Sequence, residues 1–377
     1  MSASPIVNRK PSVAHEAAGY AVTIDDVRAA AKRIAPYAHR TPVMTSSYID
    51  ELAGRSVFFK CEIFQKIGAF KFRGACNAVM KLSDDAAKRG VVTHSSGNHA
   101  QALALAAKLR GISAHIVMPR NSSAVKIRAV EGYGAKVYLC EPNQAAREGT
   151  AADVVIQTGG TLIPPYNHPD VIAGQGTIAL ELLEDVPAPG LDAIIVPIGG
   201  GGMISGICIA AHGSLPLPPG EGRGEGKKAM KPSRSSTTSQ GRTALTPGPS
   251  PRGTGAWPIK IIAAEPAGAD DSARSLTEGK LLPQDAPKTI ADGLLTGMGD
   301  LTWPIVRDHV ERVITVSDEK IIAAMRLVWE RMKLVIEPSA AVGVAVALSD
   351  EFKSMPGMQR VGVVLCGGNV DLDRLPW

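Results

Sequence analysis

The stretch DAIIVPIGGGGMISGICIAA, residues 192–211, decides between two very different folds. Its last nineteen residues carry no charge, and a membrane-spanning helix needs about 20 apolar residues. Pro197 and the four glycines Gly199–Gly202 would interrupt the continuous helical hydrogen bonding that a bilayer demands. We therefore interpret the stretch as a buried strand, a glycine loop and a helix, which is one unit of an α/β fold.

Short runs rich in β-branched residues alternate with longer helical patterns along the rest of the chain. The predicted strands are 57–62, 91–94, 114–118, 136–139, 192–198, 259–265, 313–316 and 361–366. The predicted helices begin with one near Thr23 and continue with 98–110, 124–131, 145–157, 171–184 and 318–333. This alternation predicts parallel βαβ units, with ligands bound at the carboxyl ends of the strands.

The composition is that of a soluble globular protein, with 45% hydrophobic and 20% charged residues in 377. Its five cysteines are odd in number, scattered, and without a CxxC spacing, which argues against a disulfide framework or a structural zinc site. The N-terminal segment lacks the apolar core of a signal peptide. We therefore expect a reducing, cytoplasmic location and no membrane attachment.

The net charge of +5 is concentrated in one segment, residues 213–256. This segment carries seven Lys or Arg and two Asp or Glu, which leaves 34 basic and 34 acidic residues elsewhere. Nine glycines and seven prolines among its 44 residues predict a disordered insertion, because such a composition buries too little apolar surface. A solvated insertion is favoured over nucleic-acid binding.

Two polar loops follow predicted strands and open helices. The loop of THSSGNHAQALALAAKL, residues 93–109, offers hydroxyl, amide and backbone N–H groups at a helix N-terminus. It can bind an anion, or it can be an ordinary N-cap. Gly199–Gly202 form neither a GxGxxG fingerprint nor a P-loop. A cradle for a single phosphate or a tight turn remains, and we favour the phosphate because four glycines are costly to order.

A third loop lies in VVLCGGNVDLD, residues 363–373. Cys366 ends the predicted strand there, either as a small buried hydrophobe or as the neighbour of a bound ring, and the sequence leaves both open.

Lys71 lies between Phe70 and Phe72 in FFKCEIFQKIGAFKFRGA, residues 58–75, which hold five of the six phenylalanines. Most lysines extend their ammonium into water. An amine among aromatic rings is partly desolvated, which lowers its pKa and makes it a nucleophile toward carbonyls. An aldehyde cofactor with one phosphate requires such a lysine and a glycine cradle, and pyridoxal phosphate meets both requirements.

With these motifs, the chain resembles the serine racemase and serine/threonine dehydratase family of fold type II pyridoxal-phosphate enzymes. Further matching stretches are AGQGTIALELL, AAEPAGADD, TIADG and ERMKLVIEP, in the expected order. The resemblance implies a tryptophan synthase β-like α/β fold with two open, twisted, largely parallel sheets and flanking helices. It implies a large cofactor-binding domain, residues 1–80 and 168–377, with 213–256 inserted in it, and a small domain, residues 81–167.

The resemblance also implies roles for individual residues. Lys71 would form the Schiff base and move the α-proton on one face of the substrate, and Ser96 would act on the opposite face. The implied cofactor-binding residues are Phe70, Lys71, Asn98, Asn167, Gly199, Gly200, Gly201, Gly202, Met203, Gly293, Glu337 and Cys366. The implied substrate-binding residues are Ser95, Ser96, Asn98, His99 and Arg147. Glu265, the Ala269 carbonyl and Asp271 would bind Mg²⁺ or Ca²⁺, which prefer such oxygen ligands.

The activity implied first is a dehydratase that converts L-threonine or L-serine to a keto acid and ammonia by β-elimination. The alternative is a serine racemase with dehydratase side activity, since one intermediate serves both outcomes. The resemblance implies a homodimer acting on a small hydroxy amino acid.

Two positions depart from the family pattern. Cys366 stands where Ser or Thr often faces the ring nitrogen, and its neutral, small side chain should retain elimination. Lys66, Tyr133 and Lys333 match a nucleotide site between subunits, but Ile67 replaces a common polar residue, which argues against ATP control.

Overall fold

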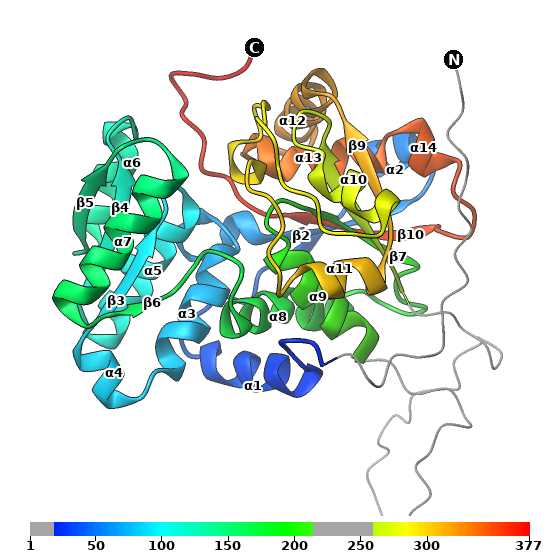
Figure 1. Ribbon diagram of the computed structural model, residues 1–377. Coiled ribbons are helices and arrows are strands. Elements are labelled where there is room, and N and C mark those ends of the chain that lie inside the picture. Colours follow the sequence, from blue (N-terminus) through cyan, green and yellow to red (C-terminus); the bar gives the residue numbers. More distant parts are fainter. Residues whose placement is uncertain (1–18, 214–258) are drawn as a thin grey trace, which may run out of the picture.

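The computed structural model describes residues 19–213 and 259–377, and its elements follow the alternation read from the sequence (Figure 1). The expected insertion 213–256 lies outside the described residues, apart from Gly213 at the end of a helix.

A six-stranded sheet forms the centre of the larger part of the molecule, in the order β1-β2-β10-β7-β8-β9. Its strands are β1 Val43–Met44, β2 Ser56–Cys61, β7 Ala193–Pro197, β8 Lys260–Pro266, β9 Val310–Val316 and β10 Arg360–Leu365. Only the β1–β2 pair within this sheet is antiparallel. Continuous apolar runs such as AIIVP in β7 are buried on both faces, as expected of a parallel sheet covered by helices.

A second, four-stranded parallel sheet has the order β5-β4-β3-β6. Its strands are β3 Val91–His94, β4 Ala114–Pro119, β5 Lys136–Cys140 and β6 Thr161–Leu162. The two sheets confirm the predicted fold class. The domain borders at residues 80 and 167 stay predictions.

Helices cover both faces of the large sheet: α12 and α13 lie on one side, and α8 and α9 on the other (Figure 1). The helices of this part are α1 Ile24–Ile34, α2 Ser47–Ala53, α3 Lys71–Lys81, α8 Pro169–Asp185, α9 Gly202–Gly213, α10 Asp271–Glu278, α11 Trp303–His309, α12 Asp318–Met332, α13 Pro338–Ala347 and α14 Asp350–Lys353. The helices around the small sheet are α4 Asp84–Lys88, α5 Asn98–Arg110, α6 Ala124–Gly132 and α7 Gln144–Thr158.

Local sequence signals explain most helix starts. Thr23 and Asp26 form a reciprocal capping box at the start of α1, where a helix was predicted to begin. Helix α13, with the sequence PSAAVGVAVA, was not predicted. Nearly all of its residues are buried, so it lacks the polar face that makes a helix recognisable.

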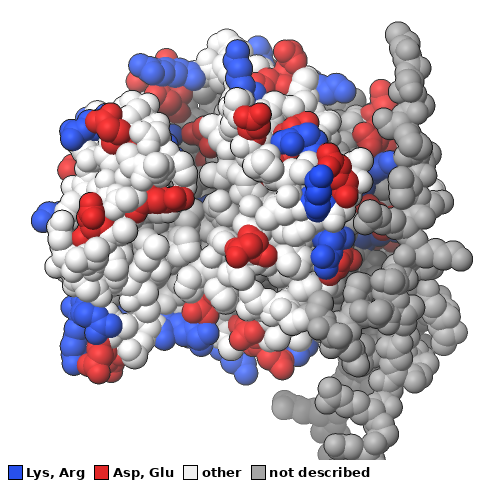
Figure 2. All heavy atoms as spheres, viewed as in Figure 1, with Lys and Arg blue, Asp and Glu red and all other residues white. Residues whose placement is uncertain are grey.

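No helix among residues 19–213 and 259–377 is long and apolar enough to cross a membrane. The five cysteines are buried and free, as their scattered spacing predicted. On the face shown in Figure 2, basic and acidic side chains are interspersed and form no basic patch among the coloured residues.

The order of the large sheet determines where the loops meet. Strands β2, β10, β7 and β8 are consecutive neighbours and run parallel. Their carboxyl ends therefore lie at one edge of the sheet, where α/β proteins bind their ligands. The segments that follow β2, β10 and β7 contain Lys71, Cys366 and Gly199–Gly202, and Glu265 lies at the carboxyl end of β8.

Candidate active site

Lys71 is the first residue of α3, which follows β2 through the short 3₁₀ turns Glu62–Phe64 and Lys66–Gly68. Its half-buried side chain donates a hydrogen bond from Nζ to the Pro165 carbonyl at 2.8 Å. Burial lowers the pKa of Lys71 to about 8, while the nearby Cys366 and Glu337 act in the opposite direction. The amine is therefore available as a nucleophile much nearer to neutral pH than an ordinary lysine.

The aromatic surroundings of Lys71 differ from the prediction. Phe70 lies beside the amine, with Nζ 5.1 Å from its ring centroid. Phe72 is fully buried on the side of the small-sheet core, so it does not enclose Lys71. Phe58 and Phe59 belong to β2, within the predicted strand 57–62, and pack into the core of the large sheet. Phe70 is therefore the nearest aromatic side chain that shields the Lys71 amine from water.

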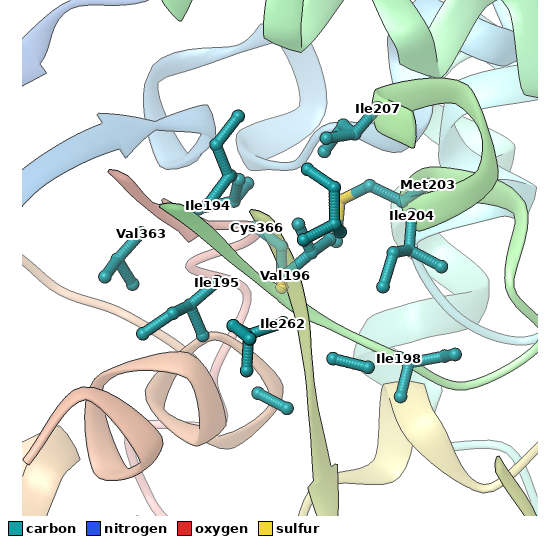
Figure 3. Packing of buried hydrophobic residues seen from close by; sticks show 14 of the residues in the cluster. Ile194, Ile195, Val196, Ile198, Met203, Ile204, Ile207, Ile262, Val363 and Cys366 are labelled. Atoms are coloured by element: carbon teal, nitrogen blue, oxygen red, sulfur yellow. The ribbon is translucent and has the colours of Figure 1, made fainter. Parts of the chain in front are cut away.

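The segment after β10 pairs with the segment that precedes Lys71. The Phe70 N–H donates to the Cys366 carbonyl at 3.0 Å, and the Gly368 N–H donates to the Gly68 carbonyl at 2.9 Å. Cys366 is 2% exposed and lies among apolar side chains of β7 and α9 (Figure 3). Burial, and then the charge of Glu337, raises the pKa of the Cys366 thiol well above its usual value. The thiol is therefore neutral, and it lies close to Lys71.

Glu337, Asn98 and Asn369 connect the loops of the two sheets. Asn98 Nδ2 donates to both carboxylate oxygens of Glu337, at 3.1 and 3.2 Å. Asn369 Nδ2 donates to Asn98 Oδ1 at 2.8 Å and to the Ile67 carbonyl at 2.7 Å. Burial, and then Asp292, raises the pKa of Glu337 to about 7. Through these bonds, the start of α5 is tied to the segment before Lys71 and to Glu337 at the start of α13.

The loop from β3 to α5 contains Ser95 and Ser96, both half-buried. The Ser95 N–H donates to the Val117 carbonyl at 3.1 Å, and its hydroxyl accepts from the Gly97 N–H at 3.3 Å. The first N–H groups of α5 lack intrahelical partners, as at any helix start, and can receive an anion.

The side chain of His99 is already engaged within the fold. Its side chain is 1% exposed, and Nε2 donates to the Ile163 carbonyl at 3.0 Å. Burial lowers the pKa of His99 to about 3, so the ring is neutral and its other nitrogen carries no hydrogen. The side chain therefore cannot donate to a substrate carboxylate. This bond links the first turn of α5 to the residue after β6, and a role of His99 toward the substrate stays a prediction that its backbone N–H can meet.

Neighbouring residues lie so close to the backbone of Gly199–Gly202 that a side chain at these positions would collide with them. A side chain at Gly200 would overlap the ring of Tyr166, and one at Gly202 would lie 2.8 Å from Tyr166 Cβ. Gly201 has φ +82°, and a Cβ there would lie 2.7 Å from Thr302 Oγ1. The loop ends at the N-terminus of α9, where Met203 follows with 6% exposure. Backbone N–H groups of a helix start beside glycine form a suitable cradle for one phosphate.

Asn167 and Gly293 border this cradle, but their polar groups already have partners. Asn167 donates to Asp300 at 2.6 Å and accepts from the Leu301 N–H at 3.0 Å. The Gly293 N–H donates to Ser339 Oγ at 3.1 Å, and the neighbouring Leu294 lies against Gly199. Both residues therefore fix the shape of the cradle's surroundings.

Arg147 lies in the first turn of α7, half-buried. Its charge contributes to lowering the pKa of His94 at the end of β3, after burial. Arg147 Nε is buried and has no hydrogen-bond partner among the described residues. A cationic side chain thus lies near His94, which precedes the serine loop, and its role toward the substrate stays a prediction.

Glu265, at the carboxyl end of β8, and Asp271, the first residue of α10, are buried carboxylates with 0% and 1% exposure. Glu265 accepts from the N–H groups of Ser272 and Ala273, both at 2.9 Å, and Asp271 accepts from the Met298 N–H at 3.0 Å. Burial raises the pKa of Glu265 to about 8 and that of Asp271 above its usual range. Two buried carboxylates beside the Ala269 turn suit a hard divalent cation.

Of the three residues matched to a nucleotide site between subunits, Lys333 lines a surface pocket. A surface pocket of about 360 Å³ is lined by Lys333 together with Ile63, Phe64, Gly68, Leu334, Val335 and Gly368. Lys66 and Tyr133 are not among its lining residues.

Three contact residues of the site were not predicted: Pro165, Tyr166 and Asn369. The carbonyl of Pro165 holds the Lys71 amine and the Tyr166 ring covers the cradle. Their sequence signals are weak: Asn369 lies three residues after Cys366, and Tyr166 immediately precedes Asn167. Taken together, a low-pKa amine, a glycine cradle and a neutral thiol meet the requirements of pyridoxal phosphate.

The comparisons with known proteins agree with this chemistry. The family model described as "Pyridoxal-phosphate dependent enzyme" matches residues 34–220 and 248–367. The chain is 47% identical over 363 residues to serine racemase of Oryza sativa subsp. indica, covering 96% of this chain and 94% of that protein. It is also 47% identical over 358 residues to beta-hydroxyaspartate dehydratase of Paracoccus denitrificans (strain Pd 1222), covering 95% and 99%.

Among solved structures, maize serine racemase matches with a TM-score of 0.81 and 47% identity, over 94% of this chain and 95% of that chain. The chain therefore belongs to the pyridoxal-phosphate dependent enzymes of fold type II, in the family of serine racemases and related dehydratases.

Proposed function

We propose that this protein is a serine racemase that also dehydrates serine. The observation that carries the proposal is the hydrogen-bonded chain from Ile67 through Asn369 and Asn98 to Glu337. This chain joins the segment before Lys71 to the loop that contains Ser96. A racemase needs two proton-transfer groups at one carbon, and both candidate groups belong to segments tied together in this way.

The sequence alone ranked a threonine or serine dehydratase first and the racemase second. The names of the relatives reverse that order. Serine racemases match at 44–47% identity over nearly the whole chain, with a dehydratase of β-hydroxyaspartate among them. We therefore take racemisation of serine as the main activity and β-elimination as its companion.

Pyridoxal phosphate, when bound, withdraws electrons from the α-carbon of an amino acid and so makes its α-proton acidic. Gly199–Gly202 and Met203 would hold its phosphate at the start of α9, with Phe70 beside the ring. The neutral Cys366 thiol would face the ring nitrogen without adding a charge. Asn167, Gly293, Asn98 and Glu337 would complete its surroundings.

Lys71 would hold the cofactor covalently and, once released by substrate, take the α-proton at Nζ. Its lowered pKa supports this role, because a base with a pKa near 8 is partly unprotonated at physiological pH. Ser96 Oγ would deliver or accept a proton on the opposite face. Return of the proton by Lys71 would regenerate the same enantiomer, whereas delivery by Ser96 would invert the carbon.

The substrate carboxylate would be bound by Ser95, by Asn98 and by N–H groups in the first turn of α5, including that of His99. Arg147 adds a positive charge near this loop, and its unpartnered Nε supports a role toward an anionic group. If the β-hydroxyl departs before reprotonation, elimination gives a keto acid and ammonia. The ratio of racemisation to elimination would therefore depend on whether Ser96 protonates the α-carbon before the β-hydroxyl is lost.

Three further properties belong to the proposal. Glu265, the Ala269 carbonyl and Asp271 would bind Mg²⁺ or Ca²⁺, since two buried carboxylates need a cation to stay ionised. The active form would be a homodimer in the cytoplasm.

The test is incubation of the purified holoenzyme with L-serine, D-serine and L-threonine, measuring keto acid and enantiomer composition in the same samples. We expect D-serine from L-serine, accompanied by pyruvate. Keto acid from L-threonine or L-serine without any D-serine would refute racemisation and restore the dehydratase as the main activity. Lys71→Ala should abolish both products.

A further inference from the structure

Helix α8 lies between α3 and α9, the two helices whose N-termini carry Lys71 and the glycine cradle. Helix α3 begins with Lys71 and α9 begins at the glycine cradle, and α8 packs against both (Figure 1). Its sequence AGQGT places two glycines around one glutamine, Gly174, Gln175 and Gly176.

Gly174 allows the backbones of α8 and α3 to touch. A Cβ at Gly174 would lie 2.6 Å from Gly74 Cα and 2.7 Å from the Arg73 carbonyl oxygen. From the side of α3, a Cβ at Gly74 would lie 2.7 Å from the Val171 carbonyl oxygen of α8. Gly74 is three residues after Lys71, so this contact acts within the first turn of α3.

Gly176 makes the equivalent contact with α9. A Cβ at Gly176 would lie 2.7 Å from the Gly206 carbonyl oxygen, and one at Gly206 would lie 2.9 Å from Gly176 Cα. Gly206 is four residues after Gly202, so this contact acts within about one turn of the cradle.

Polar bonds add a second, independent tie between α8 and the first turn of α3. Gln175 is 1% exposed, and its Oε1 accepts from the Gly74 N–H at 3.2 Å, a donor that lies at a helix start. The buried Arg73 donates to Glu181 of α8 at 2.7 Å and to Thr177 at 3.2 Å. These bonds set the register of α3 along α8, while the glycines set the separation.

We propose that α8 is a spacer that fixes the distance between the Lys71 amine and the phosphate cradle. Lys71 must reach the aldehyde of the same molecule whose phosphate occupies the cradle, so an error in this distance weakens binding at both ends. An alanine at Gly174 or Gly176 would push α3 or α9 away by about 1 Å, because carbon contacts prefer about 3.5–4.0 Å. Displacements of that size can cost about 100-fold in a positioned reaction.

The inference rests on the pyridoxal-phosphate assignment, and its test compares two ligands. Pyridoxal carries the same aldehyde without the phosphate, so it can meet Lys71 wherever the cradle lies. Apoenzyme is titrated with each ligand, and binding is followed by the absorbance of the lysine-bound chromophore. The measured quantity is the ratio of the pyridoxal dissociation constant to that of pyridoxal phosphate.

We expect Gly174→Ala and Gly176→Ala to lower this ratio at least tenfold through weaker binding of pyridoxal phosphate, with pyridoxal affinity nearly unchanged. Gly213→Ala is the matched control. It adds a methyl group at the far end of α9, where a Cβ would meet the side chain of Ile24 at 2.7 Å. Its ratio should stay within about threefold of wild type, because this contact with α1 lies about three helical turns from the cradle.

Circular dichroism and thermal unfolding check that each variant is folded. If the alanine variants do not fold, Gln175→Met provides the test, since it removes the bond to Gly74 without adding a Cβ between backbones. It should lower the ratio at least threefold. An unchanged ratio in the folded variants, or equal loss of both ligands, would overturn the spacer role alone. Wild-type apoenzyme that binds neither ligand would overturn the cofactor assignment and the inference together.

Discussion

The pKa of the Lys71 ε-amine in the apoenzyme should lie near 8, well below that of an ordinary lysine, because burial disfavours its charged form. At pH 7, a pKa of about 8 leaves about one amine in ten unprotonated, against about one in 3,000 for a pKa of 10.5. At pH 7, the unprotonated fraction of Lys71 should therefore be about 300-fold larger than that of an ordinary lysine. The cause is the removal of its ammonium from water beside Phe70 and the Pro165 carbonyl.

Competitive acetylation measures this directly. Apoenzyme is pulsed with trace acetic anhydride between pH 6 and 11, and the modified Lys71 peptide is quantified by mass spectrometry against Nα-acetyl-lysine in the same tube. The reactivity of Lys71 should rise through pH 8 and level off near pH 9, whereas that of the reference amine should keep rising beyond pH 10.

Glu337→Gln provides the matched perturbation. The carboxylate of Glu337 favours the ammonium form of Lys71, so its removal should move the titration midpoint of Lys71 further down. A midpoint at or above pH 10 in wild type, or an upward shift in Glu337→Gln, would refute the reasoning about desolvation and charge.

Three further predictions concern the cradle, the cation and the thiol. Gly201→Ala should destabilise the protein by about 1–3 kcal/mol in urea unfolding, because its φ of +82° disfavours a side chain and Thr302 blocks the space; wild-type stability would contradict this. Mg²⁺ or Ca²⁺ at about 100 times its dissociation constant should stabilise the protein by about 2.7 kcal/mol, and Glu265→Gln should abolish the rise in unfolding temperature; an equal rise in the variant would exclude this site. Cys366→Ser should keep keto acid formation within about tenfold, since the partner of the ring stays small and neutral; a change of many orders of magnitude would show that the thiol itself matters.

The strands and the loops that follow them could be predicted because each is encoded locally. Apolar runs mark the buried parallel strands, and glycine or serine loops follow them at the carboxyl edge. The side-chain contacts of the site could not be read in this way. Phe72 adjoins Lys71 in sequence but points into the small-sheet core, because successive residues of a helix face different directions.

The bonds made by Asn369 and Pro165 join segments far apart in sequence. Asn369 is 271 residues from Asn98, and Pro165 is 94 residues from Lys71. No local pattern specifies such pairs, and a carbonyl such as that of Pro165 leaves no side-chain signal at all. The neutral tautomer of His99 likewise follows from its bond to Ile163, which only the fold reveals.

The central claim is that Lys71 and Ser96 exchange protons at one carbon from opposite faces. Its most direct test is the reaction of L-serine in deuterated water, with the α-hydrogen of each enantiomer followed by mass spectrometry after chiral separation. The D-serine formed first should carry deuterium at the α-carbon, and Ser96→Ala should put deuterium into L-serine without producing D-serine. Early D-serine that retains the original hydrogen, or continued racemisation by Ser96→Ala, would contradict the two-residue account.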